Sequence, residues 1–277
     1  MSTKVRSGLR KAIIYLPLVA ITFLILYPLS AIFLSSFKTM KDFMGNPLGF
    51  PKSFTFDNYI YAWSRMHFGT YTFNSMLVAG LTVGVVCLLG AMAGYKLSLN
   101  FKGNQAVFLF FLAGMAVPTQ SYIITLFHFM KRLSLLSTYQ GLILVYTAIN
   151  LPFAIFIFSS FFRTVPRELT EAALLDGCSE WRTFWQILLP ISKPTLATVV
   201  IITAMNAWND FFVQMIVNMD QTKYTLPMGL LKFRSETSTN WTPLFASIIL
   251  VALPIAIVFI LLQKQFIKGL TNGAVKG

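Results

Sequence analysis

The sequence predicts an all-α integral membrane protein with six transmembrane helices. Of the 277 residues, 56% are hydrophobic and 11% are charged, whereas a soluble domain usually carries about a quarter charged residues. Six long segments contain almost no charge, and each exceeds the roughly 20 residues that a helix needs to cross a bilayer core. Because lipid cannot satisfy free backbone polar groups, and these segments are too long for barrel strands, they are expected to be helices.

We expect the spans to lie in order along one transmembrane domain that covers residues 1–277. Their expected bounds are about 12–37, 70–95, 104–130, 139–162, 194–218 and 243–263, with a long loop at 163–193 and a tail at 264–277. The first span follows several basic residues, as a signal peptide does, but its apolar stretch is too long and lacks a small-residue cleavage pattern. It is therefore read as a retained span. Pro118 is expected to kink the third span.

The basic residues indicate the orientation. The net charge is +13, but Lys and Arg are scattered between apolar runs and do not form the basic face that nucleic acid requires, so we expect no nucleic-acid partner. With the N-terminus in the cytoplasm, the inner segments hold 13 of the 22 Lys and Arg residues. This bias favours cytoplasmic N- and C-termini, and it places the loop at 163–193 and the tail on the cytoplasmic side.

The second span contains two Gly-x-x-x-Gly motifs, Gly80 with Gly84 and Gly90 with Gly94. Such spacing lets helix backbones approach closely in lipid. We expect these glycines to serve helix packing and not gating.

Catalytic and metal-binding motifs are absent from the sequence. His67 and His128 are far apart and have no metal-ligand spacing, and Cys87 and Cys178 suggest neither a disulfide framework nor a redox task. The chain has no Gly-x-Ser-x-Gly, no His-Glu-x-x-His and no nucleotide-binding Gly-x-x-x-x-Gly-Lys-Ser/Thr. We therefore expect no catalytic residue, no metal site and no ATP hydrolysis in this chain.

The loop at 163–193 predicts a helix-turn-helix. Pro166 suits the first turn of a helix, and Glu168 and Glu171 lie where the helix dipole favours acids. Gly177 is expected to end this helix in the left-handed conformation. Ser179 can cap a second helix, which Pro190 and Pro194 are expected to close before the fifth span.

The second helix of this loop has one apolar face. Its members fall at i, i+3, i+4 and i+7: Trp181, Phe184, Trp185 and Leu188. Burying each such side chain is worth roughly 1.5–3 kcal/mol. The pattern leaves two alternatives open, a helix lying in the membrane interface or beneath its own bundle, and a segment that docks in a groove of a soluble partner.

The same loop resembles a known family. The series Glu171-Ala172-Ala173, Gly177 and Ile187-x-Leu189-Pro190 reproduces the EAA loop of permease subunits in bacterial ABC importers at the expected spacing. From Asn58-Tyr59 onward the chain resembles the second permease subunit of maltose-type carbohydrate importers. The final run, 268–277, is similar to the C-terminal tail of that subunit.

This resemblance implies a type I ABC importer permease fold in the bacterial cytoplasmic (inner) membrane. The residues expected to couple to an ATPase are Glu171, Ala172, Ala173, Gly177, Ile187, Leu189 and Pro190. The tail residues expected to assist are Leu270, Asn272, Gly273 and Lys276. The implied partners are a second permease subunit in a heterodimer, an ATPase dimer that carries ATP and Mg, and an extracytoplasmic sugar-binding protein. That protein is expected to deliver a sugar or oligosaccharide to the outer loops, mainly 38–65 and 220–242.

The fifth span suggests where a substrate passes. Asp210 in lipid costs on the order of 2.5–3.5 kcal/mol, so it should face the bundle interior or an aqueous cavity. Family members commonly carry a Trp-Asn-acid-Phe series here, which Trp208-Asn209-Asp210-Phe211 matches. A structural role for Asp210 and a role in lining the path both stay open. The remaining path candidates are Asn209, Met205 and Gln214, with Gln120 and Tyr122 in a weaker set beside Pro118 and Thr119.

Two other function classes compete with the importer interpretation. A secondary transporter or channel subunit would usually need ion-coupling residues in several spans, and only one carboxylate lies within the predicted spans. It would also leave the cytoplasmic loop unexplained. An intramembrane enzyme would need a catalytic set that two distant histidines do not provide.

Overall fold

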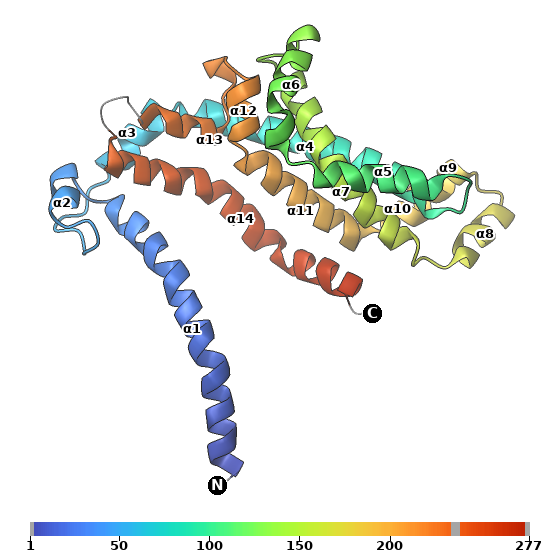
Figure 1. Cartoon of the computed structure of the whole chain (residues 1–277), viewed down its shortest axis with the longest axis horizontal. Helices are drawn as coiled ribbons and strands as arrows, with labels where there is room; N and C mark the ends of the chain where they lie inside the picture. The colour runs from blue at the N-terminus through green and yellow to red at the C-terminus, as the bar shows by residue number, and fades with distance from the viewer. Residues whose placement is uncertain (1–2, 234–238, 275–277) are drawn as a thin grey trace. The chain divides into compact units, whose positions relative to one another are not determined.

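The computed structural model describes residues 3–233 and 239–274, with side chains described for 13, 15–233, 239–261 and 263 (Figure 1). The chain divides into two compact units. Unit 1 comprises Met1–Phe68 and Leu230–Ala252, and unit 2 comprises Gly69–Gly229 and Leu253–Gly277. The long helix α14 (Trp241–Ala274) contributes its first turns to unit 1 and the rest to unit 2. The prediction of a single domain stays a prediction.

Unit 1 is built around buried polar groups. Its elements are α1 (Thr3–Ser35), α2 (Met40–Gly45), α3 (Asp57–Arg65), η3 (Leu230–Phe233) and the start of α14. The ammonium of Lys38 is fully buried and donates to the carbonyls of Asn46 at 2.8 Å and Pro47 at 3.2 Å. The amide of Asn58 donates to the carbonyl of Lys38 at 2.7 Å, and its oxygen accepts from Thr242 at 3.3 Å. These bonds fix the segment between α1 and α3, since a buried polar group is costly unless it is paired.

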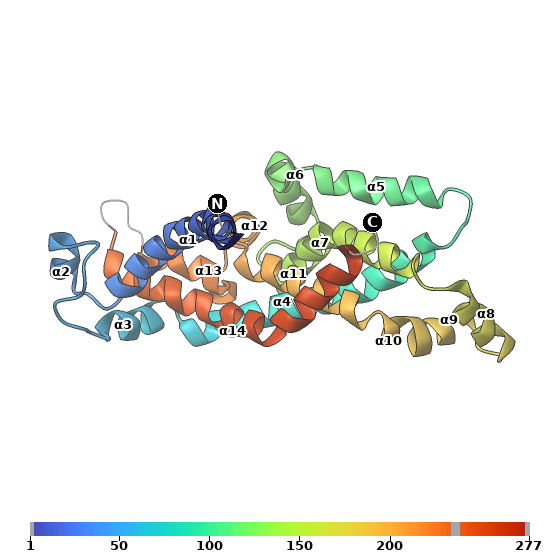
Figure 2. The same ribbon diagram turned by 90° about the horizontal axis from the view of Figure 1, so that it is seen from below.

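Unit 2 holds the main core. Its helices are α4 (Phe68–Ser98), α5 (Asn104–Ala116), α6 (Thr119–Arg132), α7 (Tyr139–Phe162), α8 (Arg167–Leu175), α9 (Glu180–Thr183), η1 (Phe184–Leu188), α10 (Leu189–Ile191), α11 (Lys193–Asn209), α12 (Phe212–Val217), η2 (Gln221–Lys223) and α13 (Leu226–Gly229). Helix α7 packs against α5 and α11, and Figure 2 shows α5 running alongside α7. Two apolar clusters form where α4, α7 and α11 meet.

The helices match the predicted spans in number when bent pairs are counted as single spans. Among the described residues, four helical segments are long and apolar enough to cross a membrane: Tyr15–Ser35, Phe68–Ser98, Tyr139–Phe162 and Trp241–Leu261. Two bent pairs raise this number to six, Asn104–Ala116 with Thr119–Arg132 and Glu180–Ile191 with Lys193–Asn209. The all-helical membrane fold is therefore confirmed.

The third span was expected as one helix over 104–130 kinked at Pro118, and the chain instead forms two helices that meet at this proline. The chain bends by 99° between α5 and α6. Val117 is extended, with φ −85° and ψ 113°, and Pro118 stands before the first residue of α6. The reason is steric, because a proline ring disfavours the helical conformation of the residue before it and supplies no N–H.

The fifth span was expected to continue to residue 218, and this was wrong. Helix α11 ends at Asn209, and Asp210 is extended with ψ 129°. The carboxylate of Asp210 accepts a hydrogen bond from the backbone N–H of Gln214 at 3.2 Å. An aspartate that bonds to backbone N–H groups of the following turn favours a helix start over a helix interior. The span is broken at the residue that was expected to be its buried charge.

Pro190 does not close the second loop helix. The backbone N–H of Leu189 donates to the carbonyl of Phe184, which makes the turn Phe184–Leu188 a π-turn. The helical run therefore continues to Ile191 and turns at Ser192 by 76° into α11. A π-turn can accommodate a proline within a helix. Its hydrogen bonds run from residue i to i−5, so the i to i−4 pattern, in which Pro190 has no N–H to donate, is already interrupted there.

The two glycine motifs have different surroundings. A Cβ at Gly90 would lie 2.7 Å from Cβ of Ala154, and one at Gly94 would lie 2.6 Å from Cβ of Phe158. This pair permits the close contact of α4 with α7, so the packing prediction is confirmed for it. A Cβ at Gly80 or Gly84 would meet nothing within 4 Å. That motif packs against no described part of this chain.

Candidate functional site

Helix α8 ends in the turn that the sequence predicted. Gly177 has a φ of +80°, and the N–H of Cys178 donates to the carbonyl of Ala173 at 2.9 Å. The N–H of Gly177 donates to the carbonyl of Leu174 at 3.0 Å. These two bonds form a Schellman motif, which needs a residue that adopts the left-handed conformation cheaply. The turn reverses the chain from α8 into α9, and Figure 1 shows the two helices side by side at one end of unit 2.

The two faces of α8 differ in exposure. Ala173 is buried, whereas Glu171 and Ala172 are exposed. Leu174 and Leu175 are 51% and 89% exposed. The two exposed leucines form an apolar surface next to Glu171 and Ala172. The rest of this short helix is mostly polar. We define this exposed face, Glu171, Ala172, Leu174 and Leu175, as the α8 face.

The second loop helix is anchored from its own chain. Phe184 and Leu188 are buried against the second apolar cluster, whose other members include Val86, Phe158 and Phe162. Trp181 and Trp185 remain 59% and 37% exposed. The apolar face is thus divided. One half lies beneath the bundle, as the first alternative predicted, and the tryptophans are left uncovered.

The last three predicted coupling residues lie at the end of this helical run. Ile187 and Leu189 are half-buried, with Leu189 packed on the same apolar cluster, and Pro190 is exposed. An ion pair between Lys96 and Glu180, with 2.5 Å between Nζ and Oε2, joins the start of α9 to the end of α4. The loop is therefore held to α4 by both apolar and ionic contacts.

A polar pocket of about 380 Å³ opens between the helix breaks of unit 2. It is lined by Thr119, Gln120, Tyr146, Ile149, Asn150, Met205, Asn206, Asn209, Asp210, Phe212 and Val213. Both breaks in the predicted spans, at Pro118 and at Asp210, adjoin it. Irregular backbone at membrane depth is tolerated where it lines a cavity or is buried in protein.

A chain of hydrogen bonds runs along one wall of this pocket. The hydroxyl of Tyr146 donates to Oδ2 of Asp210 at 2.9 Å. The amide of Asn150 donates to the backbone carbonyl of Tyr146 at 2.8 Å, and the amide of Asn206 donates to Oδ1 of Asn150 at 2.8 Å. The wall offers amides and one carboxylate, the groups that commonly hydrogen-bond to neutral polar solutes.

The predicted path residues are only partly brought together. Gln120, Met205, Asn209 and Asp210 line the pocket. Gln214 is fully buried elsewhere, where its side chain bonds to Thr225 and to the carbonyl of Lys223. Tyr122 is outside the lining, and its hydroxyl contacts that of Thr119. The path assignment itself stays a prediction.

Three lining residues with hydrogen-bonding side chains were missed by the sequence reasoning, Tyr146, Asn150 and Asn206. The signal that could have found Asn150 and Asn206 is an amide within an otherwise apolar span, because polar side chains in spans face the bundle interior. Tyr146 carried no such signal, since aromatic residues are common throughout the chain.

The loop after α12 is held in place by hydrogen bonds and an ion pair of its own polar side chains. Hydrogen bonds from Thr222 and the ammonium of Lys223 lower the pKa of Asp220 to about 2. The ammonium of Lys223 lies 2.9 Å from Asp220 and donates to the carbonyl of Ser137 at 2.8 Å. The amide of Asn74 donates to the carbonyls of Thr222 and Tyr224. These contacts give the loop a fixed conformation on unit 2.

The predicted tail residues fall outside what the structure describes. Leu270, Asn272 and Gly273 lie in the last turns of α14, whose side chains are not described, and Lys276 lies outside the described residues. Across the described part of the chain, no three His, Cys, Asp or Glu side chains gather as metal ligands.

Comparison with known proteins identifies related sequences along most of the chain. Residues 86–272 match the family described as "Binding-protein-dependent transport system inner membrane component". The chain is 37% identical over 265 residues to the probable ABC transporter permease protein YurM of Bacillus subtilis, covering 95% of this chain and 87% of that one. It is 34% identical over 253 residues to the diacetylchitobiose uptake system permease protein NgcG of Streptomyces coelicolor, covering 90% and 84%.

The fold also matches a solved structure. A chain from the crystal structure of a bacterial ABC transporter involved in the import of the acidic polysaccharide alginate superposes with a TM-score of 0.82. The match covers 96% of this chain and 99% of that chain at 23% sequence identity. At that identity the likeness concerns the fold alone, and it supports the type I permease architecture.

Proposed function

This chain belongs to the family of inner membrane components of binding-protein-dependent transport systems, and we propose that it couples an ATPase to a transport path through its α8 face. It is a permease subunit by family. The finer proposal is that α8 and the turn at Gly177 seat in a cleft of a separate ATPase subunit, which would carry the ATP and Mg. The cytoplasmic location of this loop and of both termini belongs to the same proposal.

One observation carries the coupling role, the exposed apolar surface on α8 next to a rigid turn. Leu175 is 89% exposed although it is a large apolar residue. Covering such a side chain is worth roughly 1.5–3 kcal/mol. At the same time, Ala173 and Phe184 are buried, so the helix pair cannot fold this surface inward without losing packing. A partner that covers the α8 face is the arrangement that these contacts favour, because an amphipathic helix commonly docks in a groove.

Cysteine cross-linking tests this proposal directly. In a background with Cys87→Ser and Cys178→Ser, we expect Leu175→Cys to cross-link to a cysteine in the cleft of the co-expressed ATPase subunit. Ala173→Cys, on the buried side of the same helix, is the matched control and should give little product. Equal cross-linking at both positions, or no ATPase in the product of the exposed position, would remove the coupling assignment.

We infer that the pocket at the break of α11 and α12 forms this chain's part of the translocation path. Its wall presents the carboxylate of Asp210 and the amides of Asn150 and Asn209. Such groups bind hydroxyl-rich solutes through hydrogen bonds. The relatives named above include a diacetylchitobiose permease, and others in the comparison include arabinooligosaccharide permeases. These support a sugar or oligosaccharide as the substrate.

The path proposal is tested by uptake kinetics with the assembled importer. Asn209→Ala is expected to raise the half-saturating concentration for uptake several-fold, because it removes a lining amide. Thr22→Ala, an exchange at an exposed position of α1 outside this pocket, is a control for loss of one polar group. Unchanged uptake in Asn209→Ala and Asp210→Ala variants that assemble normally would leave only a structural role for both residues.

The remaining partners are proposed from the family. A binding protein outside the membrane would deliver the substrate to the outer loops at 38–65 and 220–242, and a second permease subunit would complete the path as a heterodimer. ATP-driven closure of the ATPase dimer would then move α8 and alternate the access of the pocket. Co-purification of a tagged chain should recover a second permease and an ATPase. Recovery of the chain alone in a transport-active form would favour the secondary-transporter alternative.

A further inference from the structure

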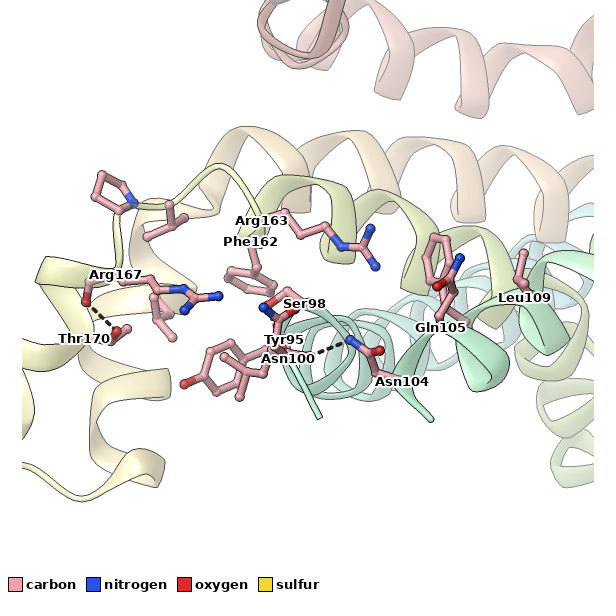
Figure 3. A pocket seen from close by; sticks show the side chains of 15 residues that line it. Tyr95, Ser98, Asn100, Asn104, Gln105, Leu109, Phe162, Arg163, Arg167 and Thr170 are labelled. Atoms are coloured by element: carbon pink, nitrogen blue, oxygen red, sulfur yellow. Dashed lines mark hydrogen bonds between the residues drawn. The ribbon is translucent and has the colours of Figure 1, made fainter. Parts of the chain in front are cut away.

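A second cavity in unit 2 lies where several membrane helices begin or end. It measures about 540 Å³ and opens between the end of α4, the start of α5, the end of α7 and the start of α8 (Figure 3). It shares no lining residue with the polar pocket at Asp210. None of its lining residues belongs to the α8 face or to the proposed path.

The lining of this cavity is basic. Arg163 and Arg167 both line it, and its lining residues include no aspartate or glutamate. Figure 3 shows Arg167 extending from α8 toward the end of α4, where Ser98 and Asn100 lie. Around the arginines stand neutral hydrogen-bonding side chains, including Asn104 and Gln105.

The contacts of the arginines leave their charges uncompensated within the described structure. The guanidinium carbon of Arg163 lies 5.0 Å from the ring centre of Phe108, and its Nη2 donates weakly to the carbonyl of Leu97 at 3.5 Å. The ring and the carbonyl orient this guanidinium, but neither carries a full negative charge. Among the described side chains, the ion pairs are Lys96 with Glu180 and Lys223 with Asp220, so neither arginine belongs to one.

We propose that this cavity binds a phosphate group, held by the guanidinium groups of Arg163 and Arg167. Arginine presents a planar set of donors that matches phosphate oxygens, and two arginines without a carboxylate partner favour a dianion or monoanion as the missing group. The amides of Asn100 and Gln105 supply further neutral donors. The phosphate has two possible sources, an anionic phospholipid headgroup and a free phosphate in solution.

The position of the cavity fits the headgroup source. Helices α4 and α7, which are both candidate membrane spans, end at it, at Ser98 and Phe162. Its lining also contains Phe108, Leu109 and Leu188, which can contact the apolar part of a lipid. A free phosphate would use only the polar side. Because Arg167 is the first residue of α8, an occupant would also restrain the start of that helix.

The test is hydrogen exchange of the assembled importer in lipid nanodiscs. One arm compares nanodiscs of phosphatidylcholine with nanodiscs that contain 30% phosphatidylglycerol. The other adds 10 mM inorganic phosphate to the phosphatidylcholine nanodiscs. The readout is amide protection in the segments 98–105 and 163–170. The variant is Arg163→Gln with Arg167→Gln, and the matched control is Lys131→Gln with Arg132→Gln at the end of α6, which removes equal charge outside the cavity.

We expect phosphatidylglycerol to protect both segments in the native chain and in the control. In the arginine variant, the protection gained at 30% phosphatidylglycerol should be largely lost, since each basic residue near an anionic surface contributes about 5-fold in affinity. Protection by inorganic phosphate alone would assign the site to a free phosphate. Equal protection of the native chain and the arginine variant in both arms, or none in either, would overturn the proposal. It does not depend on the coupling role, because the readout requires no transport.

Discussion

The ammonium of Lys96, near the end of α4, lies 2.5 Å from Oε2 of Glu180, the first residue of α9. The two residues are 84 positions apart in the chain, and both side chains are more than half exposed. The pair joins a membrane span to the second helix of the proposed coupling loop. It adds a charged contact to the apolar one between Tyr95 and Phe184, whose ring centres are 5.8 Å apart.

Reversing this ion pair should alter coupling more than stability. An exposed ion pair contributes about 0–1 kcal/mol to folding, so Lys96→Glu and Glu180→Lys should each leave the thermal stability nearly unchanged. We expect each to increase the ATP hydrolysed per substrate molecule transported by about two- to fivefold, on the scale that a loss of up to 1 kcal/mol permits. The measurement is transport stoichiometry in proteoliposomes, and the double variant Lys96→Glu with Glu180→Lys should restore it. Additive losses in the double variant would mean that the pair has no role.

Substitution of Gly177 should uncouple the ATPase. A residue with a side chain at a φ of +80° costs roughly 1–2 kcal/mol, and Asp also places a charge beside the α8 face. We expect Gly177→Asp to retain membrane insertion and ATPase activity but to lose most uptake. Gly177→Asn, which tolerates the left-handed conformation, should retain more uptake than Gly177→Asp.

The control for Gly177 is Gly103, which has a φ of +91° and open space at its Cβ, as Gly177 has. Gly103→Asp imposes a similar backbone strain outside the proposed coupling residues. Its uptake should remain near that of the native chain. Uptake in Gly177→Asp equal to that of Gly103→Asp would contradict the interface assignment.

The second glycine motif should be sensitive to a single methyl group. A Cβ at Gly94 would lie 2.9 Å from the backbone nitrogen of Ser159, which cannot move away as a side chain can. Overpacking of this kind costs about 1–3 kcal/mol. We expect Gly94→Ala to lower the thermal midpoint of the purified assembly, measured by size-exclusion chromatography after heating. Gly80→Ala is the matched control in the same helix, and its midpoint should not fall, because a Cβ at Gly80 meets nothing within 4 Å.

The hydroxyl of Tyr146 should support the broken span. It donates to the carboxylate of Asp210, and Tyr146 is 2% exposed. Tyr146→Phe removes this donor from a buried acceptor, which costs about 1–3 kcal/mol. Asp210→Asn keeps an oxygen that can accept the bond and should therefore destabilise less. The comparison requires thermal midpoints of the assembled complex, and a smaller loss for Tyr146→Phe than for Asp210→Asn would refute this ordering.

The conformation of the loop at 218–225 should be insensitive to pH between 6 and 8. A depressed carboxyl pKa contributes stability that is present above its unfolded value and is lost only as the pH falls toward the folded value, here about 2. Asp220→Ala removes the partner of Lys223, so tryptic cleavage after Lys223 in the detergent-solubilised assembly should become several-fold faster. The pH dependence of trypsin itself is corrected with a reference substrate. After this correction, the cleavage rate should be the same from pH 6 to 8 in the native chain and in the variant, because Asp220 does not titrate in this range.

The sequence determined the membrane class, the helical content and the turn at Gly177. Charge-free segments of span length and a glycine after a short acidic helix are local features. Transfer into lipid and the backbone conformation of a turn each depend on residues that are close together in the sequence. The EAA series added the family, which relatives at 37% and 34% identity confirm. The bend at Pro118 and the position of Asp210 at a cavity agree with the sequence, but the helix breaks at both residues were not expected, since a run of apolar residues does not say where a helix ends.

Tertiary structure alone decided which polar side chains meet. The contact of Asn206 with Asn150 joins residues 56 positions apart. The pocket at Asp210 exists only because the start of α6, the middle of α7 and the end of α11 come together. It also decided that Phe184 is buried and Trp181 is not, because Phe184 packs into the apolar cluster that α4 and α7 form and Trp181 does not. A pattern along the chain fixes which face of one helix is apolar. Which neighbour covers that face depends on packing energies summed over distant segments, and no local spacing records them.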